Sequence, residues 1–371
     1  MKARLLVVGG AVLVAAAGCT EAPIAPLRAT PEPLASGVGL SYKIVVDTTI
    51  DLDPTASRSE ARGINAKGWI VGTRASSGWF GVATLWKGSP VGRVDVGAGV
   101  LDWSEGSAIN DVDAIVGTAN DYSSTKGFLW RPNIGAQFIS LGNVSYLGKP
   151  ISAILASDIN NYGTIAGTAV VNAWPARVAF IKDLGGTTLL TSCSQYSSGA
   201  AVNDVNQVVG KSGQQYTDGK PFYFSGGSCT EHNSVGETMD INNSGVAVGY
   251  TGWGSERAFK WSGASGLTHL QPASDTRRTI AHGISSTSMI VGEVGDYQHE
   301  EPFVYHYQVG IVKLPDLRAS TCWRSVAPRG IAYAINDAGW IVGMSQDCFG
   351  HEHATLWKVR VVVTNQTPNS P

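Results

Sequence analysis

The sequence is poor in charged residues. Asp, Glu, Lys and Arg make up only 15% of its 371 residues, and the formal net charge is −2. No run of Lys and Arg offsets this balance. Because nucleic-acid binding depends on cationic side chains that neutralise phosphates, we exclude nucleic acid as a partner.

The sequence also lacks the periodicity of helices. No window repeats apolar residues at the spacing of an amphipathic helix. Glycine is instead abundant, with 45 residues, and the hydrophobic fraction is 43%. These values are typical of a turn-rich β protein with enough apolar residues for a large core.

The short motifs of common enzyme classes are missing. A Gly-x-Ser-x-Gly elbow, a phosphate-binding loop and a dinucleotide fingerprint do not occur in the contexts that they require. The Ser-x-Asp-x-Gly-x-Thr-Trp box of sialidase propellers does not occur either. We therefore assign no catalytic residue and expect no cofactor.

The first residues have the organisation of an export signal. Two basic residues precede Leu5–Ala17, an apolar run too short to span a bilayer. The run leads into Ala-Gly-Cys19, which resembles the lipobox of bacterial lipoproteins. The resemblance implies that residues 1–18 are a lipoprotein signal peptide and that Cys19 carries lipid, which would anchor the protein at the outer membrane or cell surface. The alternative is a plain secretory signal.

Both flanks of the chain are predicted to be unstructured. Residues 19–40 contain four prolines among Ala, Thr and Ser and show no apolar periodicity. We predict a tether that holds the folded body off the membrane. Residues 365–371 are predicted to form a disordered tail.

Between these flanks one nine-residue phrase occurs seven times. Its last copy, Ile335–Gly343, is Ile-Asn-Asp-Ala-Gly-Trp-Ile-Val-Gly, and the others begin at Ile64, Ile109, Ile159, Val202, Ile241 and Ile284. An apolar and aromatic cluster such as Gly127-Phe128-Leu129-Trp130 begins 9 to 12 residues after each terminal Gly. Successive copies are 39 to 51 residues apart, a period typical of a propeller, a solenoid or an array.

Each unit contains four short strand-like segments, the dimension of one propeller blade. We therefore predict an all-β fold for residues 41–364, a seven-bladed β-propeller of four-stranded antiparallel blades. Residues 41–50 form an additional strand, while the last unit runs from Trp357 to Thr364 without a turn for a fourth strand. We expect the N-terminal strand to complete the last blade, which removes the exposed sheet edges.

The regular positions of the phrase have structural explanations. Small residues one and three positions before its first residue suit an innermost strand. Asn in the turn tolerates the left-handed region and bonds its own backbone, and Gly supplies positive φ in four turns. The terminal Gly leaves room for the aromatic residue of the third strand. The Asn-Asp pairs carry too few acids for a calcium loop.

The Ile-Asn-x-x-Gly-x-Ile-Val-Gly phrase, followed by Ala-Phe-Leu-Trp-like clusters, resembles the bacterial extracellular HAF repeat family over residues 41–364. The resemblance implies an exported protein with a propeller-like repeat. It implies no particular activity.

Four cysteines follow Cys19, and four allow three pairings. Cys193 and Cys229 bracket one unit, and Cys322 and Cys348 bracket another. We therefore predict the disulfides Cys193–Cys229 and Cys322–Cys348, as expected in an oxidising compartment. No cysteine pair has the spacing of a zinc site.

The loops between the second and third strands are the variable part of each unit, and such loops often carry function. Each contains an aromatic residue: Trp79, Tyr122, Trp174, Tyr216, Trp253, Tyr297 and Phe349. In a propeller these loops share one rim, so we predict an aromatic rim that binds a glycan or a protein partner. The alternative is that each aromatic folds over its own hairpin.

Acidic and histidine residues at three places are candidates for catalysis or metal binding. Asp158 and Asp240 occupy equivalent positions on inner strands and are candidate channel carboxylates that could cleave a glycosidic bond, although binding to neighbouring backbone is the simpler interpretation. His299, and His351 with His353, lie in loops. A His-x-His pair can bind a transition metal, but we favour a solvated loop and expect no metal.

The sequence thus predicts a monomeric, lipid-anchored propeller that binds a glycan or protein at the cell surface. A glycan-cleaving hydrolase or lyase is the second hypothesis, and a purely structural spacer is the third. The membrane is a partner only through the N-terminal lipid.

Overall fold

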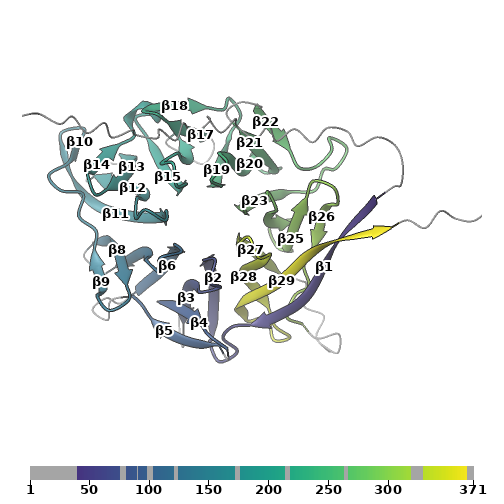
Figure 1. The fold of residues 1–371 in the computed structure, drawn as a ribbon. Helices are drawn as coiled ribbons and strands as arrows, with labels where there is room; N and C mark the ends of the chain where they lie inside the picture. The colour runs from purple at the N-terminus through teal and green to yellow at the C-terminus, as the bar shows by residue number, and fades with distance from the viewer. Residues whose placement is uncertain are drawn as a thin grey trace, which may run out of the picture. The chain divides into compact units, whose positions relative to one another are not determined.

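The computed structural model describes residues 40–75, 81–89, 91–97, 103–120, 124–171, 176–213, 218–262, 266–318 and 329–365. The predicted signal peptide, Cys19, the tether up to residue 39 and the tail from residue 366 lie outside this part. Contacts place Ser41–Thr364 in one compact unit. Its seven antiparallel sheets stand around a common axis as blades (Figure 1), which confirms the predicted seven-bladed propeller.

The first three blades follow the predicted units. Blade 1 contains β2 (Arg58–Ile64), β3 (Ile70–Ala75), β4 (Val82–Lys87) and β5 (Gly92–Asp95). Blade 2 contains β6 (Trp103–Ile109), β7 (Ile115–Asn120), β8 (Thr125–Arg131) and β9 (Gly135–Phe138). Blade 3 contains β10 (Ser145–Tyr146), β11 (Lys149–Ile159), β12 (Ile165–Val171), β13 (Arg177–Asp183) and β14 (Gly186–Leu189). The short β10 makes blade 3 five-stranded.

The next three blades each have four strands. Blade 4 contains β15 (Ser197–Val202), β16 (Val208–Ser212), β17 (Lys220–Ser225) and β18 (Ser228–Glu231). Blade 5 contains β19 (Gly236–Ile241), β20 (Val246–Thr251), β21 (Arg257–Ser262) and β22 (Gly266–His269). Blade 6 contains β23 (Thr279–Ile284), β24 (Ile290–Val294), β25 (Glu301–His306) and β26 (Gly310–Lys313).

Blade 7 joins the two ends of the chain. It contains β27 (Gly330–Ile335), β28 (Trp340–Gln346), β29 (Glu352–Asn365) and, outermost, β1 (Leu40–Asp51). Thr364 Oγ1 donates to the carbonyl of Ser41, and Leu52 N donates to the carbonyl of Ala354, so β1 runs antiparallel to β29. The predicted closure of the last blade by the N-terminal strand is confirmed.

Helix is nearly absent from the described residues. They contain one 3-10 turn, Thr191–Cys193 (η1), which lies before blade 4. Within the same residues no helix is long and apolar enough to cross a membrane.

The core lies between the blades. Each of the seven apolar clusters found among the described residues joins two adjacent sheets, as Ala201 and Val209 of blade 4 pack with Phe259 and Trp261 of blade 5. The third strands supply its largest fully buried side chains: Trp86, Phe128, Phe180, Phe222, Phe259, Phe303 and Trp357. These are the aromatic clusters that follow each phrase in the sequence.

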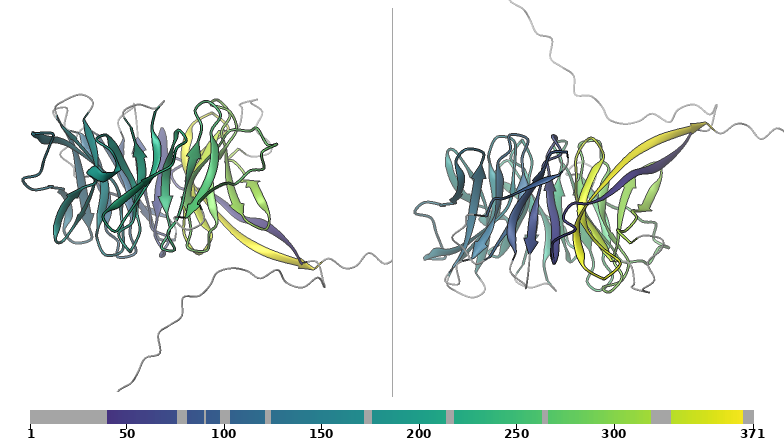
Figure 2. Two further views of the ribbon diagram at one scale, coloured as in Figure 1. Left: turned by 90° about the horizontal axis from the view of Figure 1, so that it is seen from above. Right: turned by 90° about the horizontal axis from the view of Figure 1, so that it is seen from below.

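The repeated phrase forms the turn between the first and second strands. These turns lie at one end of the propeller, the turn face, and the loops between second and third strands lie at the other, the loop face (Figure 2). All seven turns have a residue with positive φ three positions after the Asn or Ser. Four are glycines, as predicted (Gly68, Gly163, Gly245 and Gly339), and the others are Asp113, Asn206 and Ser288. The residue in the left-handed backbone conformation is therefore this later residue and not the Asn of the phrase.

The inner strand of every blade contains a β-bulge. In blade 1 the register shifts between Ala61 and Gly63, so that Arg62 is the additional residue, and the same shift recurs in the other six blades. The bulge turns the carbonyl of Glu60 toward Gly72 on the second strand, where a Cβ atom would lie only 2.0 Å from it. A side chain at the terminal Gly would thus collide with this carbonyl first. The aromatic residue of the third strand is the second reason for a Gly at this position.

The cysteines follow the repeat. Cys193 and Cys229 form a disulfide with a Cα–Cα distance of 4.8 Å, which confirms the first predicted pair. Cys348 is also disulfide-bonded, but Cys322 lies outside the described residues, so the second pairing remains a prediction.

Candidate functional site

On the turn face a belt of asparagines joins the blades. Nδ2 of each Asn donates to the main-chain carbonyl of the Asn or Ser at the same position in the next blade, over 2.8 to 3.2 Å. The donors are Asn65, Asn110, Asn160, Asn203, Asn242 and Asn336. Their Oδ1 atoms bond their own turns, as predicted, whereas the contacts between blades were not predicted.

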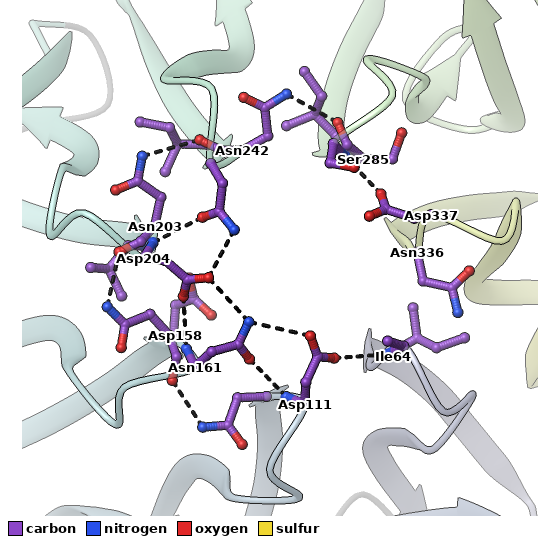
Figure 3. Close-up of a pocket in the computed structure, with 18 of the residues that line it drawn as sticks. Ile64, Asp111, Asp158, Asn161, Asn203, Asp204, Asn242, Ser285, Asn336 and Asp337 are labelled. Carbon is purple, nitrogen blue, oxygen red and sulfur yellow. Dashed lines mark hydrogen bonds between the residues drawn. The ribbon is translucent and has the colours of Figure 1, made fainter. Parts of the chain in front are cut away.

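A second belt involves the residue after each Asn. Asp111 Oδ1 accepts the N–H of Ala66, and Asp204 Oδ1 accepts the N–H of Asn161. The amide of Asn161 bonds Oδ2 of both Asp111 and Asp204, so these side chains stand next to one another (Figure 3). They surround a cavity of about 240 Å3. Because protein groups already satisfy these carboxylates, we assign the turn face a structural role.

The candidate channel carboxylates belong to this framework. Asp158 accepts the N–H groups of Ile159 and, across the blade junction, Val202, both at 2.8 Å. Asp240 accepts those of Ile241, at 2.7 Å, and Ile284, at 2.8 Å. Burial raises the pKa of both carboxyls, that of Asp158 to about 7, against the effect of the backbone bonds. This arrangement matches the simpler interpretation from the sequence, binding to neighbouring backbone.

The raised pKa of Asp158 predicts a pH-dependent contribution to stability. A raised folded-state pKa stabilises the fold most below the unfolded pKa, and that contribution is lost as pH rises toward about 7. The stability advantage of wild type over Asp158→Asn should therefore fall between pH 4 and 7, by at most about 1.4 kcal/mol per pH unit. Urea unfolding at several pH values measures this. A constant difference would contradict the prediction, and Asp95→Asn at an exposed site of β5 is the control.

The seven bulge residues face the axis and line one cavity toward the loop face. They are Arg62, Ser107, Ser157, Ala200, Met239, His282 and Tyr333. This position was not among those predicted from the sequence. The sequence did contain a signal for it: this residue differs from unit to unit and is often large, whereas the positions on either side of it are occupied by small residues. Bulges re-aim side chains and are frequent near functional sites.

The cavity has a volume of about 460 Å3 and is asymmetric. Blades 2 to 4 contribute the small residues Ser107, Ser157 and Ala200, which leave space. Blades 6, 7 and 1 contribute large polar side chains on the opposite side. The repeat therefore holds the backbone regular while one side-chain position shapes the cavity.

The large side chains form a connected group. The Arg62 guanidinium lies 4.3 Å from the centre of the Tyr333 ring and donates to Glu60 Oε1 at 2.9 Å. Tyr333 meets His282 edge-on, with ring centres 5.4 Å apart. Burial raises the pKa of Tyr333 to about 12, against the effect of Arg62, so its hydroxyl stays protonated.

The group continues outward from the axis. His282 Nε2 lies 3.3 Å from Glu293 Oε2, and Glu293 Oε1 accepts from Arg278 at 2.7 Å. Burial opposes ionisation of Glu293, but its bonds to His282 and Arg278 outweigh burial and lower the pKa. Arg278 also pairs with Glu256, which accepts the Tyr297 hydroxyl at 2.7 Å. A chain of polar contacts thus links the cavity to the rim.

Glu105 is the cavity carboxyl with the most freedom to meet a ligand. Among the described residues its carboxyl has no hydrogen-bond partner and lies half-buried beside the cavity. Burial raises its pKa, the charge of Arg62 lowers it and that of Glu60 raises it further, with a net increase. Such a carboxyl can accept ligand hydroxyls or exchange a proton.

The aromatic rim is described in part. Trp253, Tyr297 and Phe349 are 56%, 56% and 61% exposed on the loop face. The Tyr297 ring also packs against Arg278, whose guanidinium carbon lies 4.4 Å from the ring centre. Trp79, Tyr122, Trp174 and Tyr216 lie outside the described residues, so a complete rim remains a prediction.

The two histidine loops differ. His299 is exposed, and among the described residues its side chain pairs with Asp296 of its own turn, at 2.9 Å. His351 is exposed, whereas His353 is 4% exposed and bonds Asp51, the last residue of β1 in the same blade. A solvated loop, favoured from the sequence, therefore describes His299 and His351 but not His353.

Neither the known protein-family models nor the curated proteins include a match to this sequence. Solved propellers are similar in structure. Virginiamycin B lyase from Staphylococcus aureus superposes with a TM-score of 0.52 at 9% identity, over 86% of this chain and 99% of that one.

Two further solved structures are also similar. The propeller domain of the Trilobed protease from Pyrococcus furiosus has a TM-score of 0.54 at 9% identity, covering 84% of this chain and 100% of that one. Puromycin hydrolase has a TM-score of 0.55 at 11% identity, covering 88% of this chain and 57% of that one. At such identities the likeness shows the fold alone.

Proposed function

We propose that the protein is an exported, lipid-anchored binding module that takes a glycan in the axial cavity of its loop face. The proposal rests on one observation: the seven bulge residues all line a single cavity of about 460 Å3. That volume falls within the roughly 300–1,000 Å3 of small-ligand pockets. Export and the lipid anchor rest on the sequence around Cys19.

The chemistry of the lining suits a neutral, hydroxyl-rich ligand. Arg62 can donate hydrogen bonds, Glu105 and Glu237 can accept them, and Ser107 and Ser157 can do both. Because charges of both signs are present, a strongly charged ligand would meet repulsion on one side. Exposed aromatic rings at the rim offer flat apolar faces to sugar rings that extend beyond the cavity.

Substitutions in the cavity should weaken glycan binding. A hydrogen bond to a charged group contributes about 1.5–3 kcal/mol, so Arg62→Met and Glu105→Gln are each expected to weaken binding roughly tenfold or more. A glycan array identifies the ligand, and titration calorimetry of the full-length protein measures the change. The control is Leu184→Ser, at a fully exposed position in the β13–β14 turn.

Rim substitutions test the location of the site. If Trp253→Ala abolishes binding and the cavity variants do not, the ligand docks on the rim, as a protein partner would. Unchanged affinity in Arg62→Met and Glu105→Gln would contradict the cavity proposal.

The second candidate is a glycan-cleaving hydrolase or lyase. The observation in its favour is the Glu105 carboxyl, which lines the cavity, lies within the electrostatic influence of Arg62 and has a pKa that burial raises. Product formation that Glu105→Gln abolishes, with binding largely retained, would support catalysis. Binding without any product would support the binding module.

A further inference from the structure

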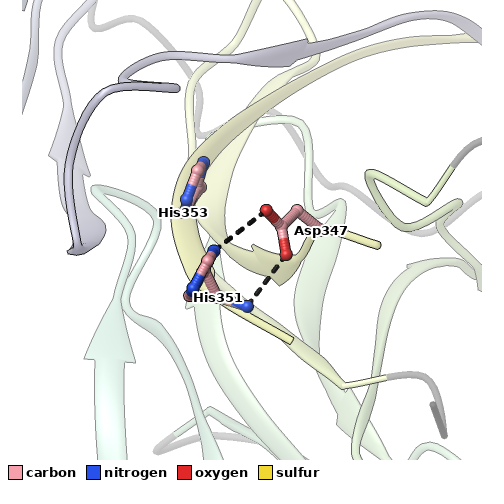
Figure 4. A group of neighbouring side chains, drawn as sticks. All are labelled: Asp347, His351 and His353. Atoms are coloured by element: carbon pink, nitrogen blue, oxygen red, sulfur yellow. Dashed lines mark hydrogen bonds and ion pairs between the residues drawn. The ribbon is translucent and has the colours of Figure 1, made fainter. Parts of the chain in front are cut away.

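Outside the axial cavity, three potential metal ligands gather on the loop face of blade 7. They are Asp347 and His351, from the turn after β28, and His353, the second residue of β29. Each offers a ligand atom, and these atoms lie within 4.8 Å of one another. Figure 4 shows the two imidazole rings side by side, with the Asp347 carboxylate turned toward them.

His353 has the environment of a metal ligand rather than of a core residue. Its Nδ1 lies 2.7 Å from Asp51 Oδ2, and because a carboxylate only accepts, Nδ1 carries the proton. Its Nε2 is buried and has no hydrogen-bond partner among the described residues. A buried polar atom without a partner is rare and requires an explanation. A cation on Nε2 would supply it.

The other two ligands are held in a similar way. Asp347 Oδ1 accepts the N–H groups of Phe349 and His351, at 2.8 and 2.9 Å, which orients the carboxylate. Its Oδ2 lies 3.3 Å from His351 Nδ1. The His351 and His353 rings are almost parallel, with an angle of 9° and centres 6.2 Å apart. Ligating carboxylates that are held by hydrogen bonds in this manner are typical of metal sites.

We propose that Asp347, His351 and His353 bind one divalent transition metal ion of the zinc class. Two imidazoles and a carboxylate suit zinc and its neighbours and not calcium or magnesium, which prefer all-oxygen sites. Atoms at the corners of a triangle with 4.8 Å sides lie about 2.8 Å from its centre, and zinc bonds are about 2.0–2.1 Å. Each ligand must therefore move by less than about 1 Å.

The ion would leave at least one coordination position open. His353 is buried at the base of the site, whereas His351 is exposed and Asp347 is half-buried. The site faces the same side of the propeller as Phe349. It also lies where β29 meets the end of β1, since Asp51 is the last residue of β1. Metal binding therefore also stabilises the closure of the ring. This inference does not depend on the proposed glycan site.

Zinc titration of the full-length, tag-free protein tests the site. After treatment with a chelator, calorimetry should detect one Zn2+ per chain with micromolar or tighter affinity, and Zn2+ should raise the unfolding temperature. Mg2+ at the same concentration should do neither. His351→Ala and Asp347→Asn should each weaken Zn2+ binding at least tenfold. Both side chains reach solvent, so these variants are expected to fold.

The matched control is His299→Ala. This residue also lies in a second-to-third-strand loop and pairs with an Asp of its own turn, but it has no second histidine. Its substitution should leave Zn2+ affinity unchanged. The proposal is overturned if Zn2+ does not bind at one per chain, or if His351→Ala and Asp347→Asn bind it as wild type does.

Discussion

Replacing Gly292 with alanine is expected to destabilise the propeller by about 3 kcal/mol or more. Gly292 ends the repeated phrase on β24, opposite Phe303 of β25. A Cβ atom at this position would lie 1.9 Å from the carbonyl oxygen of Ile280 and 2.9 Å from the Phe303 ring. The carbonyl belongs to the bulged inner strand and cannot withdraw without breaking that strand's pairing.

Two further glycine variants identify the cause. Gly343 faces Thr355 instead of an aromatic residue, but its Cβ would also lie 1.9 Å from a carbonyl, that of Ile331. If the carbonyl of the bulged strand is what excludes a side chain, Gly343→Ala should destabilise the protein as much as Gly292→Ala does. If the aromatic ring is what excludes a side chain, Gly343→Ala should destabilise the protein less than Gly292→Ala does. Urea unfolding of each variant measures the difference.

The control for this series is Gly92→Ala. Gly92 is a strand residue on β5, and its Cβ would come no closer than 3.7 Å to another atom. Its substitution should be neutral or stabilising by up to about 1 kcal/mol, because alanine reduces the entropy of the unfolded chain. Near-wild-type stability of Gly292→Ala would show that the inner strand can lose its bulge.

Removal of β1 should have the second large effect. A chain that begins at Leu52 lacks the outer strand of blade 7, including Ile44, Val46 and Ile50, which pack on the core clusters. Burial of three apolar side chains, even in part, contributes about 3 kcal/mol or more. The loss also exposes the edge of β29, a strand of 14 residues, to pairing with other chains.

The comparison protein for this experiment begins at Leu40 and keeps β1. The shorter chain should unfold at lower urea concentration and form oligomers in size-exclusion chromatography. A synthetic peptide of residues 40–52, added in excess, should restore stability by pairing with β29. Equal unfolding midpoints for the two chains would contradict a role for β1 in closing the ring.

The sequence by itself determined the architecture, because the causes of that architecture are local. Strand length, turn residues and apolar spacing repeat seven times, and each copy such as Ile335–Gly343 predicts the same hairpin. The continuous run after Trp357 and the strand at residues 41–50 even predicted which blade is shared. Gly68, Gly163, Gly245 and Gly339 were predicted correctly because positive φ is a property of single residues.

Only the tertiary structure decided how the blades hold one another and where a ligand could bind. The Nδ2 atom of Asn110 reaches a carbonyl 50 residues away, and no local pattern records that partner. Arg62 and Tyr333 come together because a bulge turns each toward the axis and because β1 closes the ring. His353 likewise meets Asp51 across 302 residues. Sequence periodicity determines which residues form a blade, whereas contacts between residues far apart in the sequence exist only in the folded propeller.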